Sequence, residues 1–495
     1  MTGFFKIHPE TAAIKQGLFV IVGAALTAAM VLYPTLAILL VAVAVSILVL
    51  WALASVLQGK TESIMKLWVL VFPLGYFFVA FPRQKSIITF DRFVIGLLLV
   101  GVIFAGRHAL APIQKDLSQA AAAWSAFAVI AGITLFRALE PMVSVRWYVD
   151  GFVFPAVLGW FVVTCFPVRR HLLALHTFTC IMTVYVTIIG MVEFFSRTSV
   201  IPLPGSAPLV YAGRFARPHG PFYNDDSFAL IGMISLFFIL FLRHALQDRW
   251  SGGRNLLHWV GVVCAVLQSL MPLFRSVGIT FLLILLLENF FEKRVTKRLA
   301  RIALIILFIG SVFGAATLVP DAYSDRSNPD NFYVRIAEQK QFIALFLDHP
   351  LFGVGIINFH AFVENNSRYM TQYHGVTSID FPHSNMGGIL SETGIVGLIP
   401  YVLAQFLLLR AFFRLSKKRN EMDLWKSALY IFLSYSVSGL TLASGYNSDL
   451  NMWFMFTLMA LYKYATTAEK PESSGSYARQ TVFATREPEF ASALR

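Results

Sequence analysis

The sequence predicts an all-α protein that crosses a membrane many times, and three observations carry this prediction. Hydrophobic residues make up 57% of the 495 residues, and charged residues only 14%. The mean hydropathy is +0.67, well above that of soluble proteins. Apolar stretches of roughly 17–25 residues recur along the chain, which is the length that an α-helix needs to cross a bilayer. The predicted architecture is a polytopic transmembrane helix bundle of about 12–14 spans.

The candidate spans are separated by short polar connections or by proline. Tyr33-Pro34 divides the first long apolar stretch, because proline cannot continue a helical hydrogen-bond ladder. Around Arg275 the sequence fits either two spans joined by a tight turn or one kinked region, so the count stays open. The candidate spans are residues 17–33, 35–57, 64–81, 93–106, 119–136, 151–167, 172–195, 227–242, 256–274, 276–291, 302–319, 393–413, 425–443 and 451–465.

Basic residues predict the orientation of the bundle. Segments 291–301 (FEKRVTKRLAR) and 414–423 (RLSKKRNEMD) are the most basic short connections, and such connections stay in the cytoplasm. One span follows the first segment and one precedes the second, so residues 320–392 are predicted to face outside. Counting back span by span also places residues 196–226 outside, and it places both termini inside. The net charge of +13 is explained in this way and does not indicate nucleic-acid binding.

This topology predicts four parts of the chain. They are a transmembrane bundle at 1–319 with its external loop 196–226, a large external loop at 320–392, C-terminal transmembrane helices at 393–465, and a disordered cytoplasmic tail at 466–495. Within the large loop, residues 331–350 place apolar side chains on one face and predict an amphipathic helix. Long external loops on a tightly connected bundle are where function is expected.

Several kinds of site are absent from the sequence. Cys165, Cys180 and Cys264 lie in apolar stretches without CxxC spacing, as expected for small buried hydrophobic residues. The chain lacks the GxxxxGK[ST], HExxH and GxSxG motifs. No DxD pair lies in an external loop, and NDD at 224–226 favours a helix cap over a metal ligand. No metal site is predicted.

The predicted external segments concentrate arginine and histidine instead. Arg214 and Arg217 lie in the first loop, Arg335 lies in the second, and His383 follows Pro382 just before the next span. A guanidinium group is a fixed fork of donors that suits phosphate oxygens, and an imidazole exchanges a proton near neutrality. Taken singly, each arginine is better explained as a solvated or headgroup-facing charge, and the histidine as a hydrogen-bonding residue at a helix start.

Taken together, the motifs resemble the O-antigen ligase and polymerase family of bacterial inner membranes. In that family an external histidine, followed by Asn, Ser or Gln, precedes Gly-x-x-Gly by nine residues. His383-Ser384 is followed by Gly394 and Gly397 at that spacing. PLFGVG at 350–355, with Gly353 and Gly355, is similar to the element that precedes this histidine, and Arg335 lies fifteen residues ahead of Pro350.

Other parts of the chain add to the resemblance, which covers roughly residues 200–440. RPHGPFYND (217–225) is similar to the family's first external loop. LFRSVG (273–278) has Arg-Ser where the family has Ser-Arg-Gly, a departure that puts the role of Arg275 in question. Gln339 stands where family members carry Trp or Leu, four residues after the loop arginine.

The resemblance implies a GT-C-like fold in the bacterial inner membrane with a periplasmic active site. It implies transfer of a glycan from undecaprenyl pyrophosphate to an acceptor hydroxyl, in lipopolysaccharide or surface polysaccharide biosynthesis, without a nucleotide, metal or other cofactor. By this resemblance His383 removes the acceptor proton, or binds phosphate as a cation. Arg217 and Arg335 bind the pyrophosphate, supported by Arg214 and Arg275, and Gly353, Gly355, Gly394 and Gly397 shape the site. A single in-line displacement would invert the anomeric centre.

Alternative functions remain at this point. A ligase transfers the glycan to lipid A-core, whereas a polymerase transfers it to another lipid-linked repeat unit, and nothing in the sequence identifies the acceptor. A transporter or flippase requires charges buried within spans, and only His176, Glu193 and Glu288 are candidates. A membrane scaffold has no need to gather arginine and histidine outside. We predict a ligase-type glycosyltransferase, provided that His383, Arg217 and Arg335 converge in space.

Overall fold

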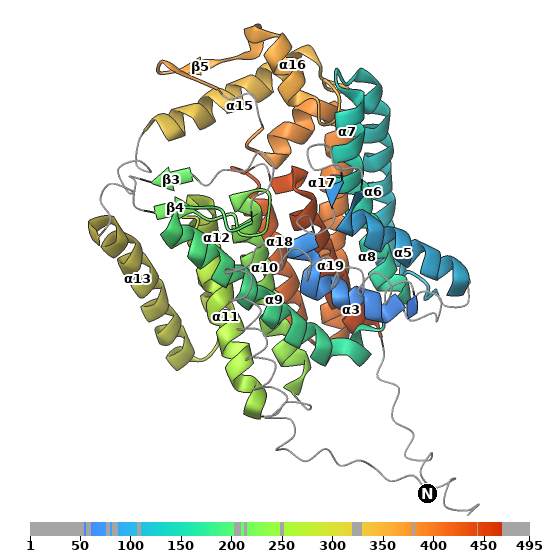
Figure 1. Cartoon of the computed structure of the whole chain (residues 1–495), viewed down its shortest axis with the longest axis vertical. Helices are drawn as coiled ribbons and strands as arrows, with labels where there is room; N and C mark the ends of the chain where they lie inside the picture. The colour runs from blue at the N-terminus through green and yellow to red at the C-terminus, as the bar shows by residue number, and fades with distance from the viewer. Residues whose placement is uncertain are drawn as a thin grey trace, which may run out of the picture.

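The computed structural model describes residues 54–55, 61–75, 80–81, 88–105, 110–201, 209–211, 215–247, 252–318, 329–378, 382–442 and 444–467. Within these residues α-helices dominate, and the strands form three two-stranded antiparallel hairpins. The predicted fold class, an all-α helix bundle, is therefore confirmed (Figure 1).

The bundle is formed by helices that follow one another along the chain. They are α3 (Thr61–Val71), α5 (Phe90–Ala105), α6 (Lys115–Thr134), α7 (Pro141–Tyr148), α8 (Phe154–Cys165), α9 (Val168–Ser196), α10 (Asp225–Ala245), α11 (Asn255–Leu270), α12 (Arg275–Phe291), α13 (Val295–Leu318), α17 (Asn385–Arg419), α18 (Met422–Ser438) and α19 (Ser448–Thr466). A π-helical turn, Val149–Val153, joins α7 to α8 without a break.

The remaining elements are short, apart from one helix. They are α15 (Asp330–Asp348), α16 (Phe359–Asn365), and the hairpins β1 (Ala80–Phe81) with β2 (Ile88–Thr89), β3 (Leu209–Tyr211) with β4 (Phe215–Arg217), and β5 (Gln372–Tyr373) with β6 (Val376–Thr377). In the predicted large loop, α15 confirms the amphipathic helix, because Ala337, Phe342 and Leu345 are buried along one face.

Each predicted span from residue 64 onward overlaps one of the bundle helices. The span at 17–33 lies outside the described residues, and so does 35–57 apart from Ala54 and Ser55. Around Arg275 the chain forms two helices, α11 and α12, joined by a tight turn with Leu273 at φ 56°. Among the described residues, five helical stretches are long and apolar enough to cross a membrane, namely 115–137, 141–165, 168–196, 225–245 and 385–419.

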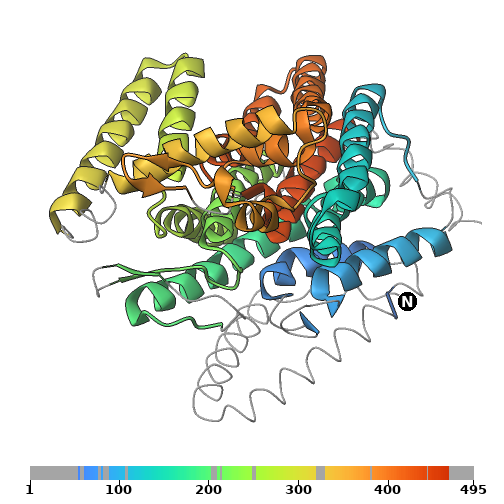
Figure 2. The same ribbon diagram turned by 90° about the horizontal axis from the view of Figure 1, so that it is seen from above.

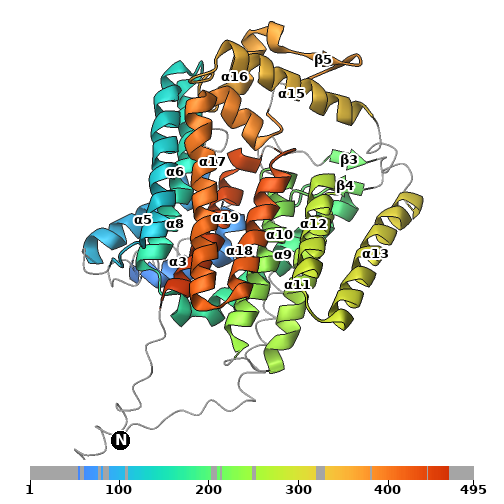
Figure 3. The ribbon, with the colours of Figure 1, turned by 180° about the vertical axis from the view of Figure 1, so that it is seen from behind.

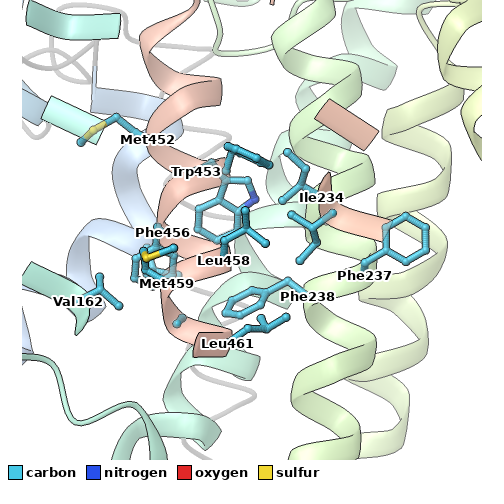
Figure 4. Packing of buried hydrophobic residues seen from close by; sticks show 14 of the residues in the cluster. Val162, Ile234, Phe237, Phe238, Met452, Trp453, Phe456, Leu458, Met459 and Leu461 are labelled. Carbon is cyan, nitrogen blue, oxygen red and sulfur yellow. The ribbon is translucent and has the colours of Figure 1, made fainter. Parts of the chain in front are cut away.

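The core of the bundle lies around α10 and α19. Trp453 of α19 is fully buried, stacks on Phe456 with ring centroids 5.5 Å apart, and donates its indole N–H to Ser235 of α10 (3.0 Å). Figure 4 shows these rings beside Ile234 and Phe238 of α10. Close packing stabilises such a bundle through van der Waals contact, because lipid tails are as apolar as the side chains themselves.

Apolar side chains also cover part of the outer surface. On α6 and just after it, Val129 is 62% exposed, Ile133 56% and Phe136 94%. Exposed apolar residues gathered on one helix face are typical of a surface that contacts lipid or protein. This outer face therefore agrees with a helix bundle embedded in a bilayer.

The two ends of the bundle differ in what they carry. At one end, Glu288 near the end of α12 pairs with Arg301 of α13 (3.0 Å) and with Lys426 of α18 (3.1 Å), so basic residues near the starts of α13 and α18 lie together. At the other end, α15 lies across the bundle with α16 and β5 (Figures 1, 2 and 3). The first turns of α10 and α12 and His383, just ahead of α17, meet beneath α15 around one cavity.

Candidate active site

The cavity beneath α15 has a volume of about 1010 Å³. Four cationic or titratable side chains that the sequence singled out line it, although they come from four different elements. They are Arg217 from the end of β4, Arg275 from the first residue of α12, Arg335 from α15, and His383 from the residues just before α17. Arg214, the fifth candidate, lies outside the described residues.

The His383 ring is held by a carboxylate that the sequence analysis did not identify. Nδ1 of His383 lies 3.0 Å from Oε1 of Glu338, and Oε2 of the same carboxylate lies 2.9 Å from Nη1 of Arg335. Glu338 is buried, with 2% of its side chain exposed, whereas the His383 side chain is 27% exposed. One buried carboxylate therefore joins two of the cavity-lining residues.

The start of α17 fixes the backbone next to His383. Ser384 is the N-cap of α17, and its Oγ accepts a hydrogen bond from the N–H of Gly387 (3.2 Å). Asn385 donates its backbone N–H to the carbonyl of Gly439 (2.7 Å), and its Oδ1 accepts from the N–H of Gly445 (2.6 Å). A capped first turn that is also bonded to the α18–α19 connection holds the preceding histidine at the cavity wall.

Arg217 is held on two sides. Its Nε lies 2.5 Å from Oδ2 of Asp225 at the start of α10, and its Cζ lies 3.8 Å from the centre of the Phe274 ring. Only 10% of its side chain is exposed. An aromatic face and a carboxylate together orient a guanidinium group with little remaining freedom.

Arg275 differs from the other two arginines. It is exposed at the cavity wall, and no carboxylate within the described part of the chain lies within ion-pair distance of it. Arg217 and Arg335 each have such a carboxylate, in Asp225 and Glu338. Arg275 therefore adds a positive charge to the cavity that no described side chain neutralises.

The two glycine-containing motifs form one structural unit. Gly394 interrupts α17 with φ 63° and ψ −166°, a conformation that is essentially restricted to glycine. Because the helical ladder is broken there, two carbonyls and two N–H groups of α17 need partners elsewhere, and residues 350–355 supply them. Val354 and Gly355 donate to the carbonyls of Ser391 and Glu392 (2.9 and 2.8 Å), and Ile395 and Val396 donate to those of Pro350 and Leu351 (2.9 and 3.3 Å).

Close approach explains three of the four predicted glycines. A Cβ at Gly394 would lie 2.3 Å from the carbonyl oxygen of Leu351, and one at Gly353 would lie 2.3 Å from the carbonyl carbon of Glu392. Gly355, at φ 108°, lies against the carbonyl of Thr134. Gly397 is different, because a Cβ there would meet only the side chain of Thr393 in its own helix.

NDD (224–226) at the start of α10 makes side-chain contacts other than the predicted helix cap. Asn224 is the N-cap residue of α10 but makes no capping bond with its side chain. Its Nδ2 instead donates to Oδ1 of Asn447 (2.7 Å), whose own Nδ2 donates to Asp226 (3.0 Å). Asp225 pairs with Arg217. Among the described residues, no group of three or more His, Cys, Asp or Glu is arranged to hold a metal ion.

Sequence reasoning missed Glu338 because a buried carboxylate on an amphipathic helix has no motif of its own. The signal in the sequence that could have found Glu338 is its spacing from Arg335 and Phe342. Glu338 lies three residues after Arg335 and four before Phe342, so all three lie on the face of α15 that turns toward α17. His176, one of the candidate buried charges, has a second histidine beside it, because its Nε2 lies 3.2 Å from Nδ1 of His258 on α11.

The fold and the site together define a polytopic helical membrane protein with a cavity at one end of its bundle that three arginines line. Residues 227–402 match the family model described as O-antigen ligase. The match runs from α10 into α17 and includes Arg275, Arg335 and His383, while Arg217 lies before it. No curated protein matches the chain.

The chain therefore carries a domain of the O-antigen ligase family, which confirms the resemblance found in its sequence. The matching domain supports a glycosyltransferase-like function in surface polysaccharide biosynthesis, in a multi-pass membrane protein.

Proposed function

We propose that the protein transfers a glycan from undecaprenyl pyrophosphate to an acceptor hydroxyl at the periplasmic end of the bundle. The observation that carries this proposal is the single cavity lined by Arg217, Arg275, Arg335 and His383. Three guanidinium groups around one cavity suit a pyrophosphate, whose oxygens accept paired hydrogen bonds from arginine. The family match on residues 227–402 supports the same class of reaction.

In the proposed reaction the acceptor oxygen attacks the anomeric carbon of the donor sugar. A new C–O bond forms, the bond from the anomeric carbon to the phosphate oxygen breaks, and undecaprenyl pyrophosphate leaves with the electron pair. Negative charge grows on the leaving group, and Arg217, Arg275 and Arg335 stabilise it. Donors that are fixed in advance in a site with little water are commonly the largest single contribution to such catalysis.

His383 takes the proton of the acceptor hydroxyl. The imidazole lies at the cavity wall, where it reaches an acceptor placed opposite the pyrophosphate. Removal of this proton by a positioned base contributes typically about 10²–10⁴-fold to a rate. Because the reaction is a single displacement from the face opposite the leaving group, it inverts the anomeric centre.

The charge distribution supports the proposed orientation. Basic residues near the starts of α13 and α18 meet at Glu288, at the end of the bundle opposite the cavity. Basic connections stay in the cytoplasm. The cavity therefore faces the periplasm in our proposal, with both chain termini in the cytoplasm and the bundle in the bacterial inner membrane.

The acceptor separates two candidate activities. We favour ligase-type transfer to lipid A-core, and the alternative is a polymerase that transfers the glycan to a second lipid-linked repeat unit. The decisive experiment reconstitutes the purified protein with an undecaprenyl-pyrophosphate-linked glycan and offers each acceptor in turn, with and without EDTA. We expect a glycan-modified lipid A-core, formed equally well in EDTA.

Each other result of this assay has a defined meaning. A ladder of lengthened lipid-linked glycans would identify a polymerase. Donor that crosses the membrane without any transfer would identify a flippase and overturn the proposed enzyme. Loss of activity in EDTA, with recovery on addition of a divalent cation, would overturn the assignment of charge stabilisation to arginine alone.

A further inference from the structure

The buried carboxylate of Glu338 lies where it contacts two residues of the proposed mechanism at once. Its two oxygens lie 3.0 Å from Nδ1 of His383 and 2.9 Å from Nη1 of Arg335. Both of those residues line the cavity, whereas Glu338 lies behind them. A carboxylate that is almost fully buried is costly unless it is paired with cationic or hydrogen-bonding partners.

Packing between α15 and α17 sets this contact. Gly387 lies in the first turn of α17, and a Cβ there would fall 2.4 Å from the Phe342 ring of α15. Phe342 lies four residues after Glu338, and Gly387 lies four residues after His383. The contact between the aromatic ring and the glycine therefore holds the start of α17 against α15, one helical turn of α15 away from Glu338.

We propose that Glu338 is a positioning residue that holds His383 in the tautomer needed for proton removal. This inference rests on the proposed function. A carboxylate next to Nδ1 keeps the proton on that nitrogen, so the lone pair of the neutral ring resides on Nε2. When Nε2 takes the proton of the acceptor hydroxyl, the same carboxylate stabilises the imidazolium that forms. The proton on Nδ1 stays beside the Glu338 carboxylate throughout, and Glu338 itself neither gains nor loses a proton.

The same carboxylate also orients Arg335. With one oxygen on each partner, Glu338 sets the guanidinium group and the imidazole at a fixed separation along the cavity wall. The proposed base and one proposed pyrophosphate ligand therefore share a single support. A glutamine at this position could accept a hydrogen bond through one atom only, and its amide nitrogen would face the other donor.

The test is a double-mutant cycle in the reconstituted transfer assay, with Glu338→Gln, His383→Ala and the combined variant. We expect Glu338→Gln to lower kcat about 10²-fold or more, by analogy with removal of the carboxylate that orients a catalytic histidine. We expect the combined variant to be slower than His383→Ala by clearly less than the full Glu338→Gln factor, because Glu338 acts mainly through the imidazole and only in part through Arg335. Glu338→Asp keeps the charge on a shorter side chain and should fall between wild type and Glu338→Gln.

The control is Glu364→Gln. Glu364 also faces a histidine at this end of the bundle, His360 at 3.8 Å, but its side chain is 69% exposed and does not line the cavity. That variant should transfer glycan at the wild-type rate. Thermal unfolding of every variant in detergent shows whether a loss of rate is a loss of fold.

Two results would overturn the positioning role. The first is a kcat for Glu338→Gln within about twofold of wild type. The second is a combined variant slower than His383→Ala by the full Glu338→Gln factor, since independent effects multiply. Should Glu338→Gln not fold, a Glu338→Asp variant with the wild-type kcat contradicts the proposal. Wild-type protein that transfers no glycan to any acceptor would instead refute the proposed function.

Discussion

At the scale of single residues, the three arginines of the cavity are not equivalent. Arg217 and Arg335 each face a carboxylate, whereas Arg275 has none within ion-pair distance among the described residues. Truncating Arg335 would leave the buried charge of Glu338 without one of its partners, and that alone destabilises a protein. Arg275 is therefore the arginine whose removal reports most directly on the binding of an anionic substrate.

We predict that Arg275→Ala lowers glycan transfer at least about tenfold without changing thermal stability, and that Arg275→Lys recovers only part of the loss. A lysine supplies the charge but not the two-pronged donor geometry. The measurement is kcat/KM for the lipid-linked donor in the reconstituted assay. Arg294→Ala, an exposed arginine in the α12–α13 connection, serves as the control. Equal rates for Arg275→Ala and its control would exclude Arg275 from the site.

We predict that His383→Ala abolishes measurable transfer, with a loss of about 10²–10⁴-fold, because the acceptor hydroxyl then lacks a base. Membrane insertion and expression should stay normal. His244→Ala is a matched control, since His244 also faces a carboxylate, Asp423 at 3.6 Å, but lies on α10 away from the cavity. Wild-type transfer by His383→Ala would remove the imidazole from the mechanism.

At the scale of elements, a broken helix forms one wall of the site. Residues 350–355 fill the gap that Gly394 opens in the hydrogen-bond ladder of α17, so the backbone stays satisfied through the break. Irregular backbone at or near a membrane is tolerated where protein supplies its partners. The part of α17 ahead of Gly394, which directly follows His383 and the N-cap Ser384, is thereby held at an angle that a straight helix would not give.

We predict that Gly394→Ala lowers the free energy of unfolding by about 1–3 kcal/mol, since a residue with a side chain is strained in this backbone conformation. A Cβ would also press on the carbonyl of Leu351. Thermal unfolding in detergent measures the loss. Gly96→Ala on α5, where a Cβ meets nothing within 4 Å, should leave the melting temperature unchanged or slightly higher. Equal melting temperatures for the two variants would contradict the proposed strain.

At the scale of the whole molecule, the bundle separates its charges by end. The basic connections meet Glu288 at one end, and the cavity with its overlying α15 lies at the other. The count of spans from the sequence likewise places residues 320–392 on the side of the membrane opposite the basic connections. It supports a donor whose lipid tail lies in the bilayer while its pyrophosphate sits at headgroup level.

We predict that a cysteine at Ser367, which is exposed beside α16, reacts with a membrane-impermeant maleimide in intact spheroplasts. A cysteine at Lys418, exposed at the end of α17, should react only after the membrane is permeabilised. Gel-shift labelling on a background that lacks Cys165, Cys180 and Cys264 measures both. The reverse pattern would invert the proposed orientation and place the cavity in the cytoplasm.

The sequence by itself determined the class of protein, the helices and the chemistry available at the site. Long apolar stretches predict helices because the backbone N–H and C=O groups inside a bilayer must form their hydrogen bonds within the same segment. Proline, glycine and basic residues mark where those helices end. The amphipathic pattern of residues 331–350 predicted α15 for the same local reason. Arg217, Arg275, Arg335 and His383 were also identified, from the concentration of arginine and histidine in the predicted external segments and from the resemblance to the O-antigen ligase family.

Only the tertiary structure decided how these pieces meet. Arg217 and His383 are 166 positions apart in the sequence (383 − 217), and no local pattern encodes their placement at one cavity. In the sequence, Glu338 cannot be told apart from any other polar residue of an amphipathic helix. In the structure, the contact of Phe342 with Gly387 places it behind His383. The bonds between residues 350–355 and α17 are likewise decided by packing, because backbone groups carry no side-chain identity. Local physics selects the elements, and long-range packing selects their partners.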